Sequence, residues 1–188
     1  MIQKKTRLDL YDISWYKPGG TSLSRLLWYF VNHLIFNSAY FPSSGLKSAI
    51  LRFFGAKIGI GVVIKPCVNI KYPWNLEIGN HSWIGEEVWI DNLGKVSIGD
   101  HVCISQGALL LCGNHNYKME TFDLMVGEIK LENGSWVGAK SIVGPGVCIG
   151  EYSVLAAGSF AGGDLEAATI YRGNPAVATR KRWSDEDE

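Results

Sequence analysis

The chain has 188 residues, of which 47% are hydrophobic and 22 are glycine, so it is long enough to bury one core and does not have the composition of a disordered chain. Eighteen basic and eighteen acidic residues cancel, and no nucleic-acid-binding motif is present, which argues against a nucleic-acid partner. The balance hides an asymmetry, because residues 1–57 hold eight lysines and arginines against two aspartates, giving +6 there and −6 in the remainder.

Residues 1–57 predict two apolar helices. The stretch SLSRLLWYFVNHLIFN (22–37) would form a helix about 24 Å long. This helix is not expected to span a bilayer, because it is too short and polar residues interrupt it. The stretch GLKSAILRFFG (45–55) places Leu46, Ala49, Ile50 and Phe53 at helical spacing. Two interpretations stay open: a helical cap over the region that follows, or a membrane-surface segment at the inner face of the inner membrane.

The four cysteines are scattered and form no CxxC pair. No cleavable leader is recognised in residues 1–10. Together these features predict a reducing, cytoplasmic compartment and thiols that act as small buried apolar residues.

From residue 58 onward the sequence has a six-residue period. Leu131, Val137, Val143, Ile149 and Leu155 are each followed six residues later by the next aliphatic or small residue, and glycine or alanine directly follows several of them. This period predicts a triangular coil in which each unit makes one short strand and one corner, three units make a turn, and turns stack at about 4.8 Å.

The period arranges the inward residues in three predicted columns and about five turns. The columns are Ile58, Ile78, Ile98, Leu131 and Ile149; Ile64, Ile84, Ile104, Val137 and Leu155; and Ile70, Ile90, Leu110, Val143 and Ala161. The coil is expected over residues 58–165, and residues 166–188 form a C-terminal extension with an acidic tail.

One long interruption breaks the period. Fifteen residues beyond the six-residue period follow Leu110, whereas only two extra residues follow each of Ile70 and Ile90. The sequence therefore predicts a loop, residues 112–128, that leaves the third corner of turn three and carries His115. A histidine ionises near neutral pH, so His115 is a candidate general base.

Several motifs carry a family resemblance. The six-residue pattern together with GNHN, WVGAKSIVGPGVCIG and YRGNPA resembles the hexapeptide-repeat acyltransferases. The stretches FGAKIG, KYPWNLEIG and WIGEEVWIDNLGKVSIGDHVCISQGA resemble, more narrowly, the O-acetyltransferases assigned to colanic acid and related exopolysaccharide synthesis. The match covers about residues 50–180.

The resemblance implies a mainly β fold, a left-handed parallel β-helix, and a homotrimer with active sites between subunits. It implies transfer of an acetyl group from acetyl-CoA, the co-substrate, to a sugar hydroxyl, in bacterial exopolysaccharide or surface polysaccharide synthesis. His115 matches the family's catalytic histidine. The acceptor is expected to be a sugar or a lipid-linked sugar.

Candidate acidic partners of His115 come from the stacking and from the loop. Asp91 directly follows Ile90, one turn below the corner from which the loop leaves, so it is expected to orient the imidazole or to bind an acceptor hydroxyl. Asn92 beside it and Asp123 in the loop are further candidates for substrate binding, and Asp123 is the alternative helper of His115.

The resemblance places the coenzyme along turns four and five. Trp136 falls near the acyl end, and the backbone wall for the pantetheine arm falls on Gly138, Ala139, Ala156, Ala157 and Gly158. Arg172 and Arg180 in the C-terminal extension are expected to meet the phosphates.

Other functions are weighed against this one. A small free sugar or an antibiotic is the alternative acceptor. A zinc enzyme resembling carbonic anhydrase would need three convergent histidines, but His81 and His101 are expected to stack on each other while His115 leaves from another corner, so no metal is expected. A non-catalytic β-helix scaffold is the remaining class.

Overall fold

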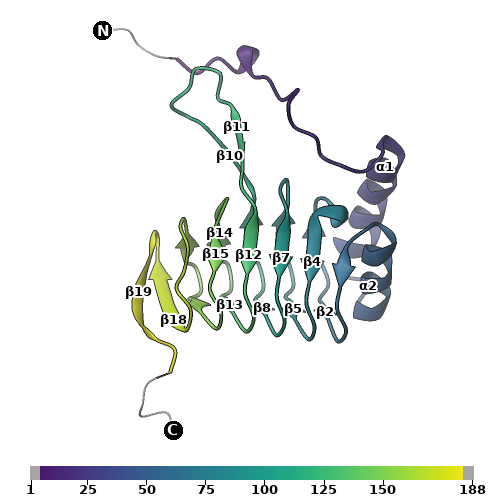
Figure 1. Cartoon of the computed structure of the whole chain (residues 1–188). Helices are drawn as coiled ribbons and strands as arrows, with labels where there is room; N and C mark the ends of the chain where they lie inside the picture. The colour runs from purple at the N-terminus through teal and green to yellow at the C-terminus, as the bar shows by residue number, and fades with distance from the viewer. Residues whose placement is uncertain (1–4, 184–188) are drawn as a thin grey trace.

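The computed structural model describes residues 5–183. The chain forms a coil of short parallel strands, with helices over one end and a hairpin that projects from the side (Figure 1). Strands at equivalent places in successive turns pair in parallel and make the three sides of the coil.

The three sheets take one strand from each turn. The first contains β1 (Lys57–Ile58), β4 (Leu76–Ile78), β7 (Val96–Ile98), β12 (Ile129–Leu131) and β15 (Cys148–Ile149). The second contains β2 (Val63–Ile64), β5 (Trp83–Ile84), β8 (Cys103–Ile104), β13 (Trp136–Val137), β16 (Val154–Leu155), β18 (Thr169–Gly173) and β19 (Ala176–Lys181). The third contains β3 (Asn69–Ile70), β6 (Trp89–Asp91), β9 (Leu109–Leu111), β14 (Ile142–Val143) and β17 (Phe160–Ala161).

The three predicted columns are confirmed by the strand registers. Ile78 pairs with both Ile58 and Ile98, and the other column members follow the same rule. All column residues belong to the core, although Ile58 at the first turn is only partly buried. The aliphatic residue that leads each unit therefore points inward, as the period requires.

The coil continues beyond the five predicted turns. Leu165 bridges to Ile149, and β18 pairs with β16, which places Tyr171 over Leu155. The sixth turn is incomplete because β19 folds back antiparallel on β18. The six-residue rule missed this turn because Leu165 follows Ala161 by only four residues.

Two helices and their extensions cover the first turn. After a short 3-10 turn, η1 (Leu8–Leu10), the chain forms α1 (Ser22–Val31), which continues as the π-helix η2 (Asn32–Phe36), and then α2 (Ser44–Phe53). A second 3-10 turn, η3 (Pro73–Asn75), occupies the extra residues after β3. The predicted helices are therefore present at the end of the coil where the edges of β1, β2 and β3 would be open (Figure 1).

Buried side chains fix both helices to the coil. Trp28 of α1 is buried and its indole Nε1 donates to Ile70 O at 2.8 Å. Leu51 of α2 is fully buried, and so is Lys47, whose Nζ donates to Lys65 O at 2.7 Å. Burial lowers the pKa of Lys47. Of the apolar residues at helical spacing on α2, Ile50 packs against the core, whereas Leu46, Ala49 and Phe53 are exposed, and Lys47, Ser48 and Leu51 occupy the inner side.

Several smaller expectations have structural outcomes. The rings of His81 and His101 stack with centroids 5.3 Å apart, as predicted. All four thiols are free, but only Cys112 is buried, since the other three lie partly exposed on the coil. No helix within residues 5–183 is both long and apolar enough to cross a membrane.

Candidate active site

The loop expected at residues 112–128 contains an antiparallel hairpin that projects from the coil (Figure 1). Its strands are β10 (Gly113–His115) and β11 (Leu124–Val126), and His115 pairs with Leu124 near the tip. At its base, Cys112 N donates to Asp91 O at 3.2 Å. Burial raises the pKa of the Cys112 thiol to about 11, so the thiol stays neutral.

The imidazole of His115 is held in one orientation. Its Nδ1 lies 2.9 Å from Phe122 O. A carbonyl oxygen can only accept, so in the neutral imidazole Nδ1 carries the proton and Nε2 has the lone pair. The ring stacks on Phe122 with centroids 4.4 Å apart and meets the ring of Tyr11 at 5.6 Å. This tautomer suits a general base that acts through Nε2.

An N-terminal strap, residues 7–18, runs between the hairpin and α1 (Figure 1). Arg7 N donates to Glu120 O at 2.8 Å, and Trp74 Nε1 donates to Pro18 O at 2.7 Å. Between these two contacts, the hydroxyl of Tyr16 donates to Leu93 O at 2.8 Å. Burial is the main cause that raises the pKa of Tyr16, and the nearby Tyr72 and Asp91 raise it further. From the sequence, residues 7–18 were expected only to belong to the N-terminal segment, because no repeat fixes their position.

The strap closes a cavity over His115 of about 490 Å³. It is lined by Tyr11, Ile13, Tyr16, Pro18, Lys71, Tyr72, Leu93, His115 and Leu124. The volume lies within the range of small-molecule sites, about 300–1,000 Å³. A substrate group in this cavity would meet the imidazole.

Asp91 lies where the stacking argument placed it, one turn from the hairpin base, with β6 pairing Asp91 to Leu111. Its carboxylate does not orient His115, whose Nδ1 is taken by Phe122 O. Instead Asp91 Oδ1 lies 2.8 Å from Lys71 Nζ, and Asp91 is only 8% exposed. Lys71 was missed, although it directly follows Ile70 as Asp91 follows Ile90, so the same stacking argument would have found it.

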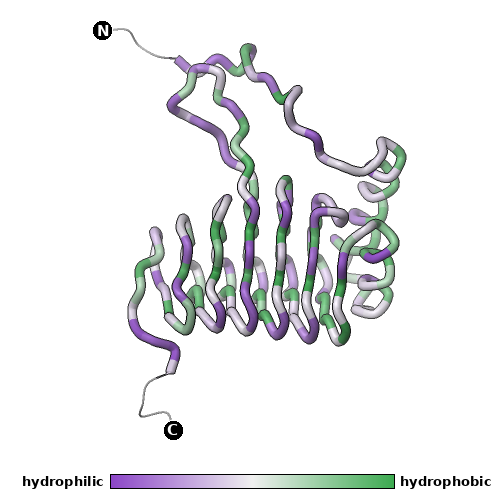
Figure 2. Tube along the Cα trace, in the orientation of Figure 1, coloured by the Kyte–Doolittle hydropathy of each residue, from purple (hydrophilic) through white to green (hydrophobic). Residues whose placement is uncertain are grey.

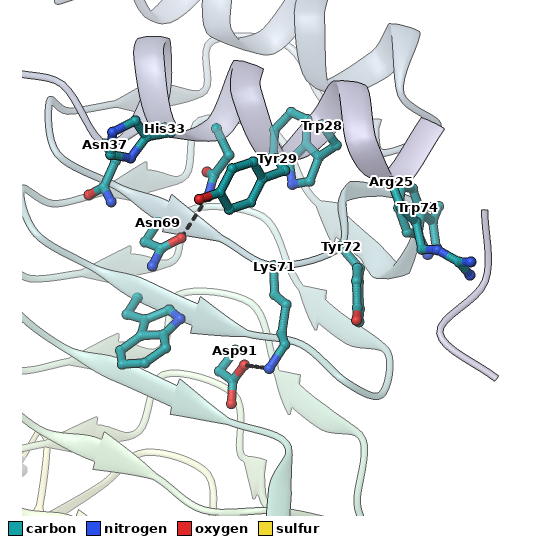
Figure 3. Close-up of a pocket in the computed structure, with 12 residues that line it drawn as sticks. Arg25, Trp28, Tyr29, His33, Asn37, Asn69, Lys71, Tyr72, Trp74 and Asp91 are labelled. Atoms are coloured by element: carbon teal, nitrogen blue, oxygen red, sulfur yellow. Dashed lines mark hydrogen bonds and ion pairs between the residues drawn. The ribbon is translucent and has the colours of Figure 1, made fainter. Parts of the chain in front are cut away.

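A second cavity of about 400 Å³ adjoins the first (Figure 3). Lys71 and Tyr72 line both. Its other walls come from α1, from η2 and the residue after it, from η3 and from the third sheet: Arg25, Trp28, Tyr29, Asn32, His33, Asn37, Asn69, Trp74, Trp89 and Asp91. Aromatic faces and polar groups therefore continue from the His115 cavity along the coil toward α1.

The other expected substrate-binding residues have different placements. Asn92 is fully buried, and its amide bonds the main chain of Tyr72 in both directions, at 2.9 Å through Oδ1 and 2.6 Å through Nδ2. It therefore joins two turns and is not free to bind a substrate. Asp123 lies in the hairpin, where its main-chain oxygen accepts from Asn116 N at 2.9 Å. Its side chain is not among the groups that hold the imidazole.

The expected coenzyme wall is a stack of small residues at one corner. Gly138 N donates to Leu155 O and Gly158 N donates to Ala139 O, both at 2.8 Å. A Cβ on Gly138 would lie 2.5 Å from Ala157 N, so this close stacking requires glycine. Ala157 and Gly158 are exposed on the corner, and Ala156 and Ala139 are partly so. A smooth surface of this kind fits the narrow pantetheine arm.

The wall and the histidine do not meet within one chain. None of the wall residues lines either cavity near His115. Trp136 is 45% exposed on the second sheet and donates from Nε1 to Ser105 Oγ at 2.9 Å. Arg172 and Arg180 are exposed on the final hairpin of β18 and β19. The acidic tail from Asp185 onward lies outside the described residues.

Among residues 5–183, no group of three histidine, cysteine, aspartate or glutamate side chains is placed to hold a metal ion.

Known proteins resemble this chain along most of its length. It is 38% identical over 168 residues to WcaF of Escherichia coli strain K12, provisionally named a colanic acid biosynthesis acetyltransferase, covering 89% of this chain and 92% of that protein. It is 26% identical over 154 residues to the galactoside O-acetyltransferase of the same strain, covering 78% and 73%. No family model matches the chain.

Solved structures share the fold. A galactoside acetyltransferase in complex with coenzyme A superposes with a TM-score of 0.77 at 25% identity, covering 88% of this chain and 83% of that one. A hexapeptide-repeat acetyltransferase of Vibrio cholerae O1 biovar eltor, complexed with acetyl coenzyme A, also gives 0.77, at 22% identity over 86% and 88%. The expected fold class, a left-handed parallel β-helix, is therefore correct, with the turn count amended as above.

Proposed function

The chain belongs to the hexapeptide-repeat acetyltransferases related to WcaF, which use acetyl-CoA, and we propose that it acetylates a sugar hydroxyl with His115 as general base. The observation that carries this proposal is the hydrogen bond from His115 Nδ1 to Phe122 O. In the neutral ring this bond leaves the lone pair on Nε2, and His115 lines a cavity of substrate size.

The proposed step is a direct transfer. Nε2 of His115 takes the proton of the acceptor hydroxyl as its oxygen forms a bond to the acetyl carbon. The carbon–sulfur bond of the thioester breaks, and the imidazolium returns its proton to the departing sulfur. A neutral imidazole thus starts and ends each cycle, with Phe122 O holding the same tautomer throughout.

The two adjoining cavities supply an acceptor site. Asp91, which is nearly buried, and Lys71, which is partly exposed, form an ion pair beside the His115 cavity, and such a pair can hydrogen-bond sugar hydroxyls from both sides. Tyr29 and Trp89 offer exposed ring faces in the second cavity. We assign Asp91 to acceptor binding and not to orientation of the imidazole.

Two chains would complete each site. The coenzyme wall at Gly138 and Ala157 and the cavity at His115 lie apart in one chain, whereas side-by-side packing of three coils would bring the wall of one chain to the hairpin of the next. We therefore propose a homotrimer with three shared sites, in which exposed Arg172 and Arg180 serve the coenzyme phosphates.

The proposed setting is exopolysaccharide or surface polysaccharide synthesis in the cytoplasm, on a sugar or lipid-linked sugar. This assignment follows the similarity to WcaF. A small free sugar or an antibiotic remains the alternative acceptor.

The test is acetyl-CoA turnover with a panel of soluble sugars, lipid-linked sugars and antibiotics, followed by mass spectrometry of the acceptor. The proposal expects an O-acetylated sugar. Turnover only with an antibiotic, or acetylation only of an amine, would contradict it.

A further inference from the structure

The outer side of α1 is apolar where a surface helix is normally polar. At 3.6 residues per turn, the exposed Leu23, Leu26 and Phe30 lie opposite the buried Trp28, and Leu27 of α1 and Leu34 of η2 are exposed as well. Leu23 is 65% exposed. Figure 2 shows hydrophobic residues along this helix, which lies at the end of the coil with its far side turned outward.

The outer side of α2 repeats the pattern. Leu46, Ala49 and Phe53 are exposed opposite the buried Leu51, and Phe53 is 84% exposed. In the connection between the helices, Tyr40 is 90% exposed and Phe41 is also exposed. Two polar side chains of α2, Lys47 and Ser48, are instead buried against the coil, whereas Arg52 is exposed.

This arrangement inverts the usual amphipathic pattern. A helix packed on a soluble core buries its apolar stripe and leaves charged residues outside. Here both helices expose apolar side chains. We call the exposed apolar residues of α1, α2 and their connection the outer surface. An exposed apolar surface of this kind marks a site of contact with a protein or a membrane.

The charge around this surface has one sign. From Ile13 to Leu76 the sequence contains no aspartate or glutamate but seven lysines and arginines. Lys47 is buried, and Lys57 and Lys71 pair with Glu77 and Asp91. The remaining four are the exposed Lys17, Arg52 and Lys65 and the partly exposed Arg25 on α1. Apolar side chains within a basic surround match the interface of an anionic lipid bilayer.

We propose that the outer surface docks on an anionic phospholipid bilayer, with its apolar side chains in the interfacial region and the neighbouring basic groups at the lipid headgroups. Neither helix is long enough to span the bilayer, so the contact is peripheral. The second cavity is lined by Arg25, Tyr29 and His33 of the same helical segment, so docking would bring that cavity next to the headgroups.

Assembly into a trimer would strengthen binding to the bilayer. Three coils packed side by side in one direction would turn all three outer surfaces to the same end of the trimer. Three weak contacts on one plane bind much more strongly than one. Docking itself does not depend on the proposed acetyl transfer, so the two can fail separately.

The test is flotation of the full chain with vesicles of phosphatidylcholine alone or mixed with phosphatidylglycerol. We expect binding to the anionic vesicles, weakened by salt. The variant Leu23→Gln/Phe30→Gln, and separately Phe53→Gln, should lower vesicle partitioning, by about tenfold or more for the double variant. Val177→Gln is the matched control, since Val177 is 61% exposed on β19 at the opposite end of the coil.

Far-UV circular dichroism and thermal unfolding check that each variant is folded, and acetyl transfer should be unchanged because none of the altered residues lines the His115 cavity. Absence of vesicle binding would overturn the proposal, as would equal loss in Val177→Gln. A second copy as the occupant would appear as a larger assembly in light scattering that Phe53→Gln disrupts, without vesicle binding, and that result would also overturn it.

Discussion

Nδ1 of His115 lies 2.9 Å from the main-chain oxygen of Phe122, and the two rings stack with centroids 4.4 Å apart. The group that orients the imidazole is therefore part of the backbone of the same hairpin. A side-chain substitution elsewhere does not remove this carbonyl oxygen. The roles of His115 and of the neighbouring carboxylates can therefore be tested separately by mutation.

Asp91→Asn should raise the KM for the acceptor and cost much less than loss of the base, for which the range is roughly 10²–10⁴-fold. The substitution removes the charge beside Lys71 but leaves Phe122 O in place. Steady-state kinetics with varied acceptor measure this effect, and Asp123→Asn is the comparison. If Asp91→Asn were silent while Asp123→Asn abolished turnover, the loop aspartate would hold the assisting role.

Gly138→Ala should lower the free energy of unfolding by about 1–3 kcal/mol, because its Cβ would meet Ala157 N at 2.5 Å and the turns would have to separate. Denaturant unfolding measures the change. Gly45→Ala is the control, since it has open space in α2 and should stabilise by up to about 1 kcal/mol. Equal effects of the two substitutions would contradict the close stacking.

The buried thiol of Cys112 should make the folded protein less stable at alkaline pH. Burial raises the pKa of its thiol from 9.0 to about 11, so above pH 9 the unfolded chain releases a proton that the folded chain keeps, and stability falls as pH rises. Between pH 9 and 10 the wild type should lose up to about 1 kcal/mol more than Cys112→Ala. Unfolding at each pH measures this difference, and identical slopes would contradict it.

The sequence predicted the coil well because one physical rule, an inward aliphatic residue every six positions, applies to each unit separately. It failed where another constraint acts. Leu165 follows Ala161 by four residues and breaks the spacing, and Asn92, expected to bind substrate, is buried between turns. The direction that the apolar residues of α2 face stayed open in the sequence, because helical spacing identifies a stripe without saying what it packs against.

The site was predicted in part. His115 stood out as the one histidine in the long interruption, and Asp91 followed from stacking. The strap of residues 7–18 and the role of Phe122 O depend on contacts between segments far apart in the chain and on a main-chain group, neither of which leaves a signal in residue types.

Shared sites predict recovery of activity in mixed trimers. His115→Ala chains lack the base, and Ala157→Trp chains should lack coenzyme binding because the exposed corner is filled. Neither parent should turn over, but co-assembled chains should regain part of the wild-type rate, because some sites combine an intact hairpin with an intact wall. No recovery in verified mixed trimers, or an active monomer, would contradict the arrangement.

The most direct test of the account is acetyl transfer by His115→Ala, measured together with its binding of acetyl-CoA. Removing the imidazole should leave the coil and coenzyme binding unchanged, because His115 lies in the projecting hairpin and the proposed coenzyme contacts come from the wall residues of turns four and five. Turnover should fall by roughly 10²–10⁴-fold. Wild-type turnover in a folded His115→Ala protein that binds acetyl-CoA would contradict the central claim.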